Sequence, residues 1–79
     1  MQFVVQTKYP IHSEQCKEVV NILSEASLQE SDPPLEMNGH YYNYYTVDKE
    51  ADTNYLINAL IAQPSVLAAY LKPKDHPAL

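Results

Sequence analysis

The histidines and the cysteine are the side chains best suited to metal binding or catalysis, and they are few and scattered. His12, His40 and His76 lie far apart along the 79-residue chain, and Cys16 is its single cysteine. A zinc site needs three or four converging ligands, and no His-x-x-x-His or Cys-x-x-Cys pair supplies them. Cys16 lies among apolar residues at helical spacing, where a buried, unreactive thiol is the common case. We therefore expect no metal ligand and no catalytic residue.

Glycine is equally scarce, since Gly39 is the one glycine of the chain. A nucleophilic serine in a Gly-x-Ser-x-Gly turn and a phosphate-binding loop each require more than one. A chain this short also has little room for a pocket beside its core. The sequence therefore predicts a domain that is not an enzyme and takes no cofactor. A small enzyme or ligand-binding protein that uses tyrosine and histidine side chains is an alternative that requires such a pocket.

Tyrosine, by contrast, is concentrated in one segment, where Tyr41, Tyr42, Tyr44 and Tyr45 flank Asn43. Because side chains alternate along a strand, Tyr42 and Tyr44 share one face, and Tyr41 and Tyr45 share the other. One pair must point away from the helices that cover the sheet, and the sequence does not decide which. The outward pair serves either as a structural cross-strand pair or as a contact patch for a protein. Base stacking on RNA is a third interpretation.

The charge of the chain argues against nucleic acid and membrane partners. The formal net charge is −5, from ten acidic residues, five lysines and no arginine. Phosphate backbones and anionic lipids are bound mainly through Lys and Arg, so we expect a protein partner, no nucleic acid and no membrane. Glu36 is the carboxylate of most interest, because it lies in a predicted hairpin. It serves either solubility or the binding of a partner helix at its N-terminus.

Apolar periodicity and turn residues predict four strands and two helices. The strands are expected at residues 2–8, 35–37, 40–47 and 65–71, and the helices between them. Asn38-Gly39 separates the two middle strands and is the dipeptide most typical of a two-residue type I′ turn.

Each predicted helix begins at a polar residue suited to cap its N-terminus. Ser13 is expected to cap the first helix, which must stop before Asp32-Pro33-Pro34. Asp48 is expected to cap the second helix, which ends at Gln63-Pro64.

The element order strand–helix–strand–strand–helix–strand predicts the α+β ferredoxin-like fold, a four-stranded antiparallel sheet with two helices on one face. Two helices cannot cover both faces, so the other face is left for solvent or a partner. We expect one domain over residues 1–71 and an extended tail over residues 72–79. In the last strand, simple alternation places Val66, Ala68 and Tyr70 on one face.

The start of the chain has no basic segment followed by an apolar run, so it does not indicate a signal peptide. No stretch approaches the ~18 consecutive apolar residues of a transmembrane helix. If the chain is complete, these features favour a cytoplasmic protein.

The last third of the chain, residues 57–79, resembles the end of the propeptide and inhibitor domains of subtilisin-like serine proteases. In those domains a second helix leads through a Pro-x-Val corner into a last strand with an aromatic residue and then a charged tail. Here Pro64-Ser65-Val66 matches the corner and Ala69-Tyr70-Leu71 matches the strand.

The resemblance implies a non-catalytic module that packs its open sheet face on two surface helices of a protease. It implies that Tyr42 and Tyr44 lie on the docking face and that Glu36 caps protease helices. It also implies a tail that lies substrate-like in the protease cleft, formed by His76, Pro77, Ala78 and Leu79. The alternative is a generic ferredoxin-like domain for protein interaction or homo-oligomerisation, with no protease partner.

Overall fold

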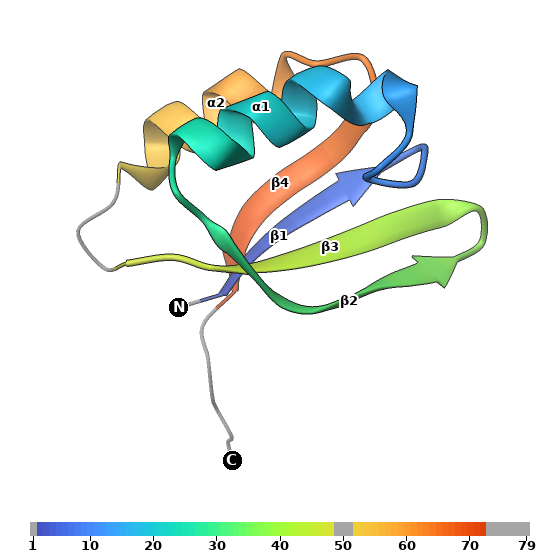
Figure 1. Cartoon of the computed structure of the whole chain (residues 1–79), viewed down its shortest axis with the longest axis horizontal. Helices are drawn as coiled ribbons and strands as arrows, with labels where there is room; N and C mark the ends of the chain where they lie inside the picture. Colours follow the sequence, from blue (N-terminus) through green and yellow to red (C-terminus); the bar gives the residue numbers. More distant parts are fainter. Residues whose placement is uncertain (1, 49–51, 73–79) are drawn as a thin grey trace.

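The computed structural model describes residues 2–48 and 52–72 of the chain, in which a sheet is covered on one face by helices (Figure 1). The elements are β1 (Gln2–Thr7), the short 3-10 turn η1 (Glu14–Cys16), α1 (Lys17–Glu25), β2 (Gln29–Met37), β3 (His40–Thr46), α2 (Thr53–Ile61) and β4 (Val66–Lys72). Neither α1 nor α2 is long and apolar enough to cross a membrane.

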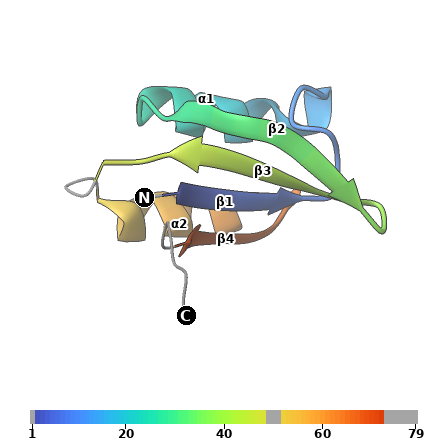
Figure 2. The ribbon, with the colours of Figure 1, turned by 90° about the horizontal axis from the view of Figure 1, so that it is seen from below.

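The strands lie in the order β2-β3-β1-β4, and every neighbouring pair is antiparallel. Figure 2 shows this order from the face without helices, with α1 behind the β2 side and α2 behind the β4 side. This arrangement confirms the predicted ferredoxin-like fold. Lys72, which was expected to open the tail, is instead the last residue of β4. The rest of the predicted tail, residues 73–79, lies outside the described part of the chain.

The core lies between the helices and the sheet, because α1 and α2 turn their apolar sides toward the central strands. From β1, Phe3 and Val5 point into it and are fully buried. The buried core residues are Phe3, Val5, Ile11, Cys16, Val19, Leu23, Tyr45, Val47, Leu56, Leu60 and Val66.

The first helix begins differently from the prediction, since Ser13 does not cap it through its side chain. The Ser13 hydroxyl donates instead to the carbonyl of a preceding residue, Pro10, at 2.6 Å. Its carbonyl accepts from the Cys16 amide at 3.1 Å, which closes the turn η1 that leads into α1. A tight 3-10 turn of this kind is a common way to start a helix without a side-chain cap.

The end of α1 is a Schellman motif built on Ser27. The Leu28 amide donates to the Leu23 carbonyl at 3.2 Å, and the Ser27 amide donates to the Ser24 carbonyl at 3.0 Å. Ser27 adopts the left-handed conformation, with φ of 60°, at the position where glycine is usual. The motif ends α1 before Asp32-Pro33-Pro34, as predicted.

The second helix begins later than predicted. Its cap is Asp52, whose Oδ1 accepts from the Tyr55 amide at 3.1 Å, whereas Asp48 lies outside the helix. Both aspartates have the right chemistry for a cap. The helix that starts after Asp52 presents Leu56 and Leu60 to the core.

The hairpin turn is confirmed and its first arm is corrected. Asn38 and Gly39 have φ of 57° and 80°, as a type I′ turn requires, and Met37 pairs with His40 across it. The first arm, β2, is three times longer than the predicted residues 35–37 and includes Pro33 and Pro34. Proline lacks a ladder donor but is tolerated at the edge of a sheet, where β2 lies.

In β4, the predicted alternation fails at Val66. The pairing with β1 shifts where Gln6 opposes Ala68 but Thr7 opposes Val66. Val66 therefore turns into the core, although it was expected to share a face with Ala68 and Tyr70.

Candidate functional site

The phase of β3 decides which tyrosine pair faces outward. Asn43 is 1% exposed, and its Nδ2 donates to the Val5 carbonyl at 2.9 Å and to Thr7 Oγ1 at 3.2 Å. Tyr45 lies on the same side as Asn43 and belongs to the core. Because side chains alternate, Tyr42 and Tyr44 point to the face without helices.

The centre of that face is a short row across three strands. Val4 of β1 pairs with Tyr44 of β3 on one side and with Tyr70 of β4 on the other. Val4 is only 1% exposed although it points away from the helices, whereas Tyr70 is 41% exposed. The tyrosines on β3 and β4 therefore flank a buried aliphatic side chain, Val4, and Tyr70 itself remains exposed.

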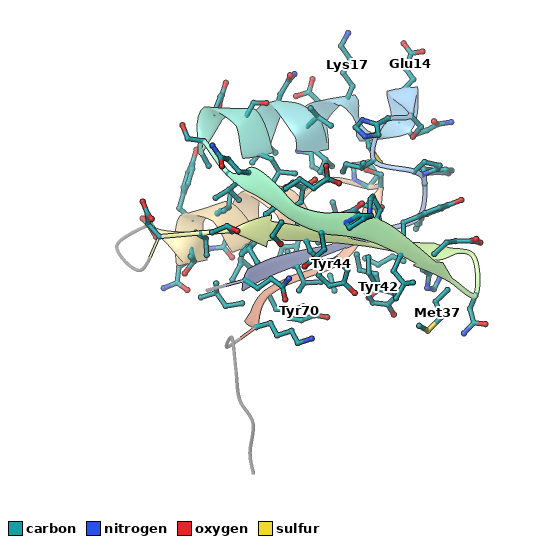
Figure 3. All side chains as sticks on the ribbon, turned by 60° about the horizontal axis from the view of Figure 1, so that its bottom comes forward. Glu14, Lys17, Met37, Tyr42, Tyr44 and Tyr70 are labelled. Carbon is teal, nitrogen blue, oxygen red and sulfur yellow. The ribbon has the colours of Figure 1, made fainter. Side chains whose placement is uncertain are left out.

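We call this surface the aromatic face. It encloses a hollow of about 320 Å³, and it is lined by Val4, Leu35, Met37, Tyr42, Tyr44, Tyr70 and Lys72. Figure 3 shows Met37, Tyr42, Tyr44 and Tyr70 together on the side of the sheet opposite to Glu14 and Lys17 of the helical layer. Large apolar side chains in a continuous patch are the usual mark of an interaction surface on a small domain.

The electrostatics of the aromatic face favour the neutral phenol of Tyr70. Partial burial raises the pKa of Tyr70, and the neighbouring hydroxyls of Tyr42 and Tyr44 raise it further. Neutral phenols both donate and accept hydrogen bonds, so the face can satisfy either kind of polar group on a partner.

Polar pairs border the aromatic face at both ends. Gln6 Nε2 lies 3.2 Å from His40 Nδ1 near the hairpin, and Gln2 Nε2 donates to Asp32 Oδ2 at 2.9 Å at the other end. An apolar centre with a polar rim is the anatomy of protein interfaces.

The other residues predicted to bind a partner are not gathered on this face. Glu36 pairs with Tyr41, so its side chain leaves the sheet on the opposite side from Tyr42 and Tyr44. Glu36 is therefore not part of the aromatic face, and its role at the N-termini of partner helices stays a prediction. The tail residues His76, Pro77, Ala78 and Leu79 lie outside the described residues.

The cysteine, a candidate for chemistry, lies apart from the aromatic face. Cys16 is fully buried, and its thiol lies 3.6 Å from the Tyr9 carbonyl. Within residues 2–48 and 52–72, no three His, Cys, Asp or Glu side chains gather as metal ligands would.

Sequence reasoning missed five members of the aromatic face, namely Val4, Leu35, Met37, Tyr70 and Lys72. Leu35 could have been found, because a two-residue turn at Asn38-Gly39 fixes the register and places Leu35 opposite Tyr42. The strand order also places β4 beside β1, and so Tyr70 beside Val4. The register of β4 against β1 depends, however, on a shift that no residue of the sequence indicates.

Comparison of the chain with protein-family models, with curated proteins and with solved structures finds no match in any of the three.

Proposed function

We propose that this domain is a non-catalytic protein-binding module that docks a protein partner on its aromatic face. The observation that carries the proposal is the row Tyr44–Val4–Tyr70, in which half-buried Tyr44 and exposed Tyr70 flank the buried side chain of Val4. Tyrosine is enriched at protein interfaces because it offers a large contact area, few rotatable bonds and one polar group. The net charge of −5 and the absence of arginine favour a neutral or basic protein surface over a nucleic acid.

The partner class that we propose is a subtilisin-like serine protease. The support is the similarity of residues 57–79 to the end of propeptide-type inhibitors, together with a ferredoxin-like fold whose sheet has one open face. In this proposal the aromatic face packs on surface helices of the protease, and His76 to Leu79 occupy the cleft in extended form, as strand-like segments do in protease sites.

The test is a titration of a purified subtilisin-type protease with this domain, with inhibition of a chromogenic substrate as the readout. The double variant Tyr42→Ser/Tyr44→Ser should raise the inhibition constant at least 10-fold, because removal of each interface tyrosine at a hot spot costs about 2 kcal/mol. Tyr55→Ser is the matched control, because Tyr55 is 71% exposed and lies on α2, in the helical layer. A variant that lacks residues 76–79 tests the tail separately.

Inhibition that falls with both the aromatic-face variant and the tail deletion supports the proposal. Inhibition that survives Tyr42→Ser/Tyr44→Ser, or falls equally with Tyr55→Ser, contradicts the assignment of the aromatic face. Absence of inhibition at micromolar protein, against several proteases of this class, favours the alternative of a ferredoxin-like interaction or homo-oligomerisation domain with no protease partner.

A further inference from the structure

The two outer strands of the sheet differ in how they are protected against pairing with another strand. An outer strand presents a row of unpaired N–H and C=O groups, and natural proteins usually blunt it with proline, charge or irregular pairing. β2 carries all three devices. It includes Pro33 and Pro34, three carboxylates at Glu30, Asp32 and Glu36, and two register shifts in its pairing with β3.

The opposite edge, β4, is hardly protected. Its sequence Val-Leu-Ala-Ala-Tyr-Leu-Lys contains no proline and one charge, at its last residue. From Ala68 to Lys72 it pairs with β1 without a break, and the single irregularity lies before Ala68. Two of its side chains, Leu67 and Tyr70, are large, apolar and exposed, at 39% and 41%.

We infer that the β4 edge pairs with the β4 edge of a second copy of this chain. Two-fold symmetric dimers are the commonest assemblies of identical subunits, and two identical strands paired antiparallel have this symmetry. Pairing centred on Ala69 sets Ala68 opposite Tyr70 of the second copy, so each large ring lies beside a methyl group. In the same register the two Lys72 side chains lie at opposite ends of the paired segment, and no two like charges face each other.

The geometry of the domain is compatible with this dimer. Tyr70 and Ala68 lie on the open side of the sheet, and Ala69 lies on the helical side. A two-fold axis perpendicular to the sheet places the open side of one copy beside the open side of the other. The two sheets then form a single eight-stranded sheet with all helices on one face. The small Ala69 at the axis leaves room for the helical layers of the two copies. This surface is distinct from the aromatic face, although the two share Tyr70.

The oligomeric state at ~0.15 M salt tests the inference, by sedimentation equilibrium from about 5 µM to 1 mM. The paired variants are Ala68→Glu/Tyr70→Glu and Ala68→Lys/Tyr70→Glu. In the proposed register, position 68 opposes position 70 of the other copy, so the first variant sets like charges together and the second sets opposite charges together. We expect the dissociation constant of the first to exceed that of the second at least 10-fold. Circular dichroism establishes that both variants are folded.

Two controls separate this inference from the proposed function. Tyr42→Ser/Tyr44→Ser should leave the dimer unchanged within about 2-fold, because those side chains lie on β3, two strands away from the β4 edge. Amide exchange across Ala68–Lys72 should slow as the protein concentration rises.

Four results overturn the inference. A monomer at 1 mM excludes the dimer, and equal dissociation constants for the two charge variants exclude the register. A dimer that Tyr42→Ser/Tyr44→Ser abolishes assigns self-association to the aromatic face instead. Protection of the β4 amides that appears only after a protease is added assigns the edge to a strand of that protein. None of these outcomes depends on whether the domain inhibits a protease.

Discussion

Replacement of Ser27 by glycine should stabilise the fold, because the backbone at Ser27 holds a conformation that glycine adopts freely. Ser27 follows α1 with φ of 60°, and its amide and that of Leu28 close the Schellman motif. A residue with a Cβ pays about 1–2 kcal/mol in the left-handed region. Ser27 is exposed, so the loss of its side chain removes little packing.

The gain is partly offset in the unfolded chain, where glycine is more flexible and costs roughly 0.5–1 kcal/mol to order. The net expectation for Ser27→Gly is a stabilisation of about 0.5–1 kcal/mol, the difference between these two values. For a domain of this size that corresponds to an increase in Tm of roughly 2–8 °C.

Urea denaturation followed by circular dichroism measures the change, with Ser24→Gly as the matched control. Ser24 is also exposed, but it lies within α1, where glycine is about 0.5 kcal/mol less favourable than serine. The same substitution at two sites three residues apart should therefore change the free energy of unfolding in opposite directions. A destabilised Ser27→Gly protein would refute the description of the α1 terminus as a strained left-handed cap.

Two further predictions concern alkaline stability and the cap of α2. Burial, with a smaller contribution from nearby Glu30, raises the pKa of Tyr45 to about 12, so the folded state favours the neutral phenol. The neutral phenol contributes about 3 kcal/mol to the free energy of unfolding below pH 10, and this contribution is lost as the pH rises from 10 to 12. Urea titrations at pH 9 and pH 11.5 measure the loss. The free energy of unfolding should fall less between these two pH values for Tyr45→Phe than for the native protein or for Tyr55→Phe. Asp52→Ala should lower the free energy of unfolding by about 0.5–2 kcal/mol, whereas Asp52→Asn, which preserves the accepting oxygen, should change it little; equal losses in both variants would show that the charge matters more than the cap.

The sequence predicted the fold because its strongest signals are local and agree with one another. Asn38-Gly39 fixes a hairpin, and the apolar stripes of the two helices fix one covered face of the sheet. The order of β-branched and helical segments then leaves few arrangements besides the observed one.

The details that the sequence did not predict depend on tertiary contacts. Pro33 and Pro34 argue against a strand, and they are accommodated only because β2 lies at the edge of the sheet with an interrupted register. Asp48 and Asp52 are equally suited by residue type to cap a helix, and no local signal marks Asp52 as the cap of α2. Val66 turns inward because the pairing of β4 with β1 shifts beside it, and no residue type marks that shift.

The aromatic face shows the same division between local and non-local information. Tyr42 and Tyr44 were identified from their spacing, but their direction is set by Asn43, whose side chain bonds to Val5 and Thr7 across the sheet. The alternation that turns Tyr42 and Tyr44 outward turns Glu36 to the other side, since Glu36 pairs with Tyr41. The pairing of strands, and not the composition of any one of them, therefore decides which predicted residues can act together.

Tyr70 connects the two surfaces that we assign to binding. It flanks Val4 on the aromatic face and, in the proposed dimer, lies beside Ala68 of the second copy. A partner that orders Tyr70 on the aromatic face lowers the entropic cost of ordering the same side chain in the β4–β4 contact of the proposed dimer. The reverse holds equally, because coupling between two binding equilibria is reciprocal. A dimer also joins two aromatic faces into one surface, so a partner with a repeated or extended contact site would bind with avidity that a monomer lacks. We therefore expect the proposed self-association and the proposed partner binding to be linked through Tyr70.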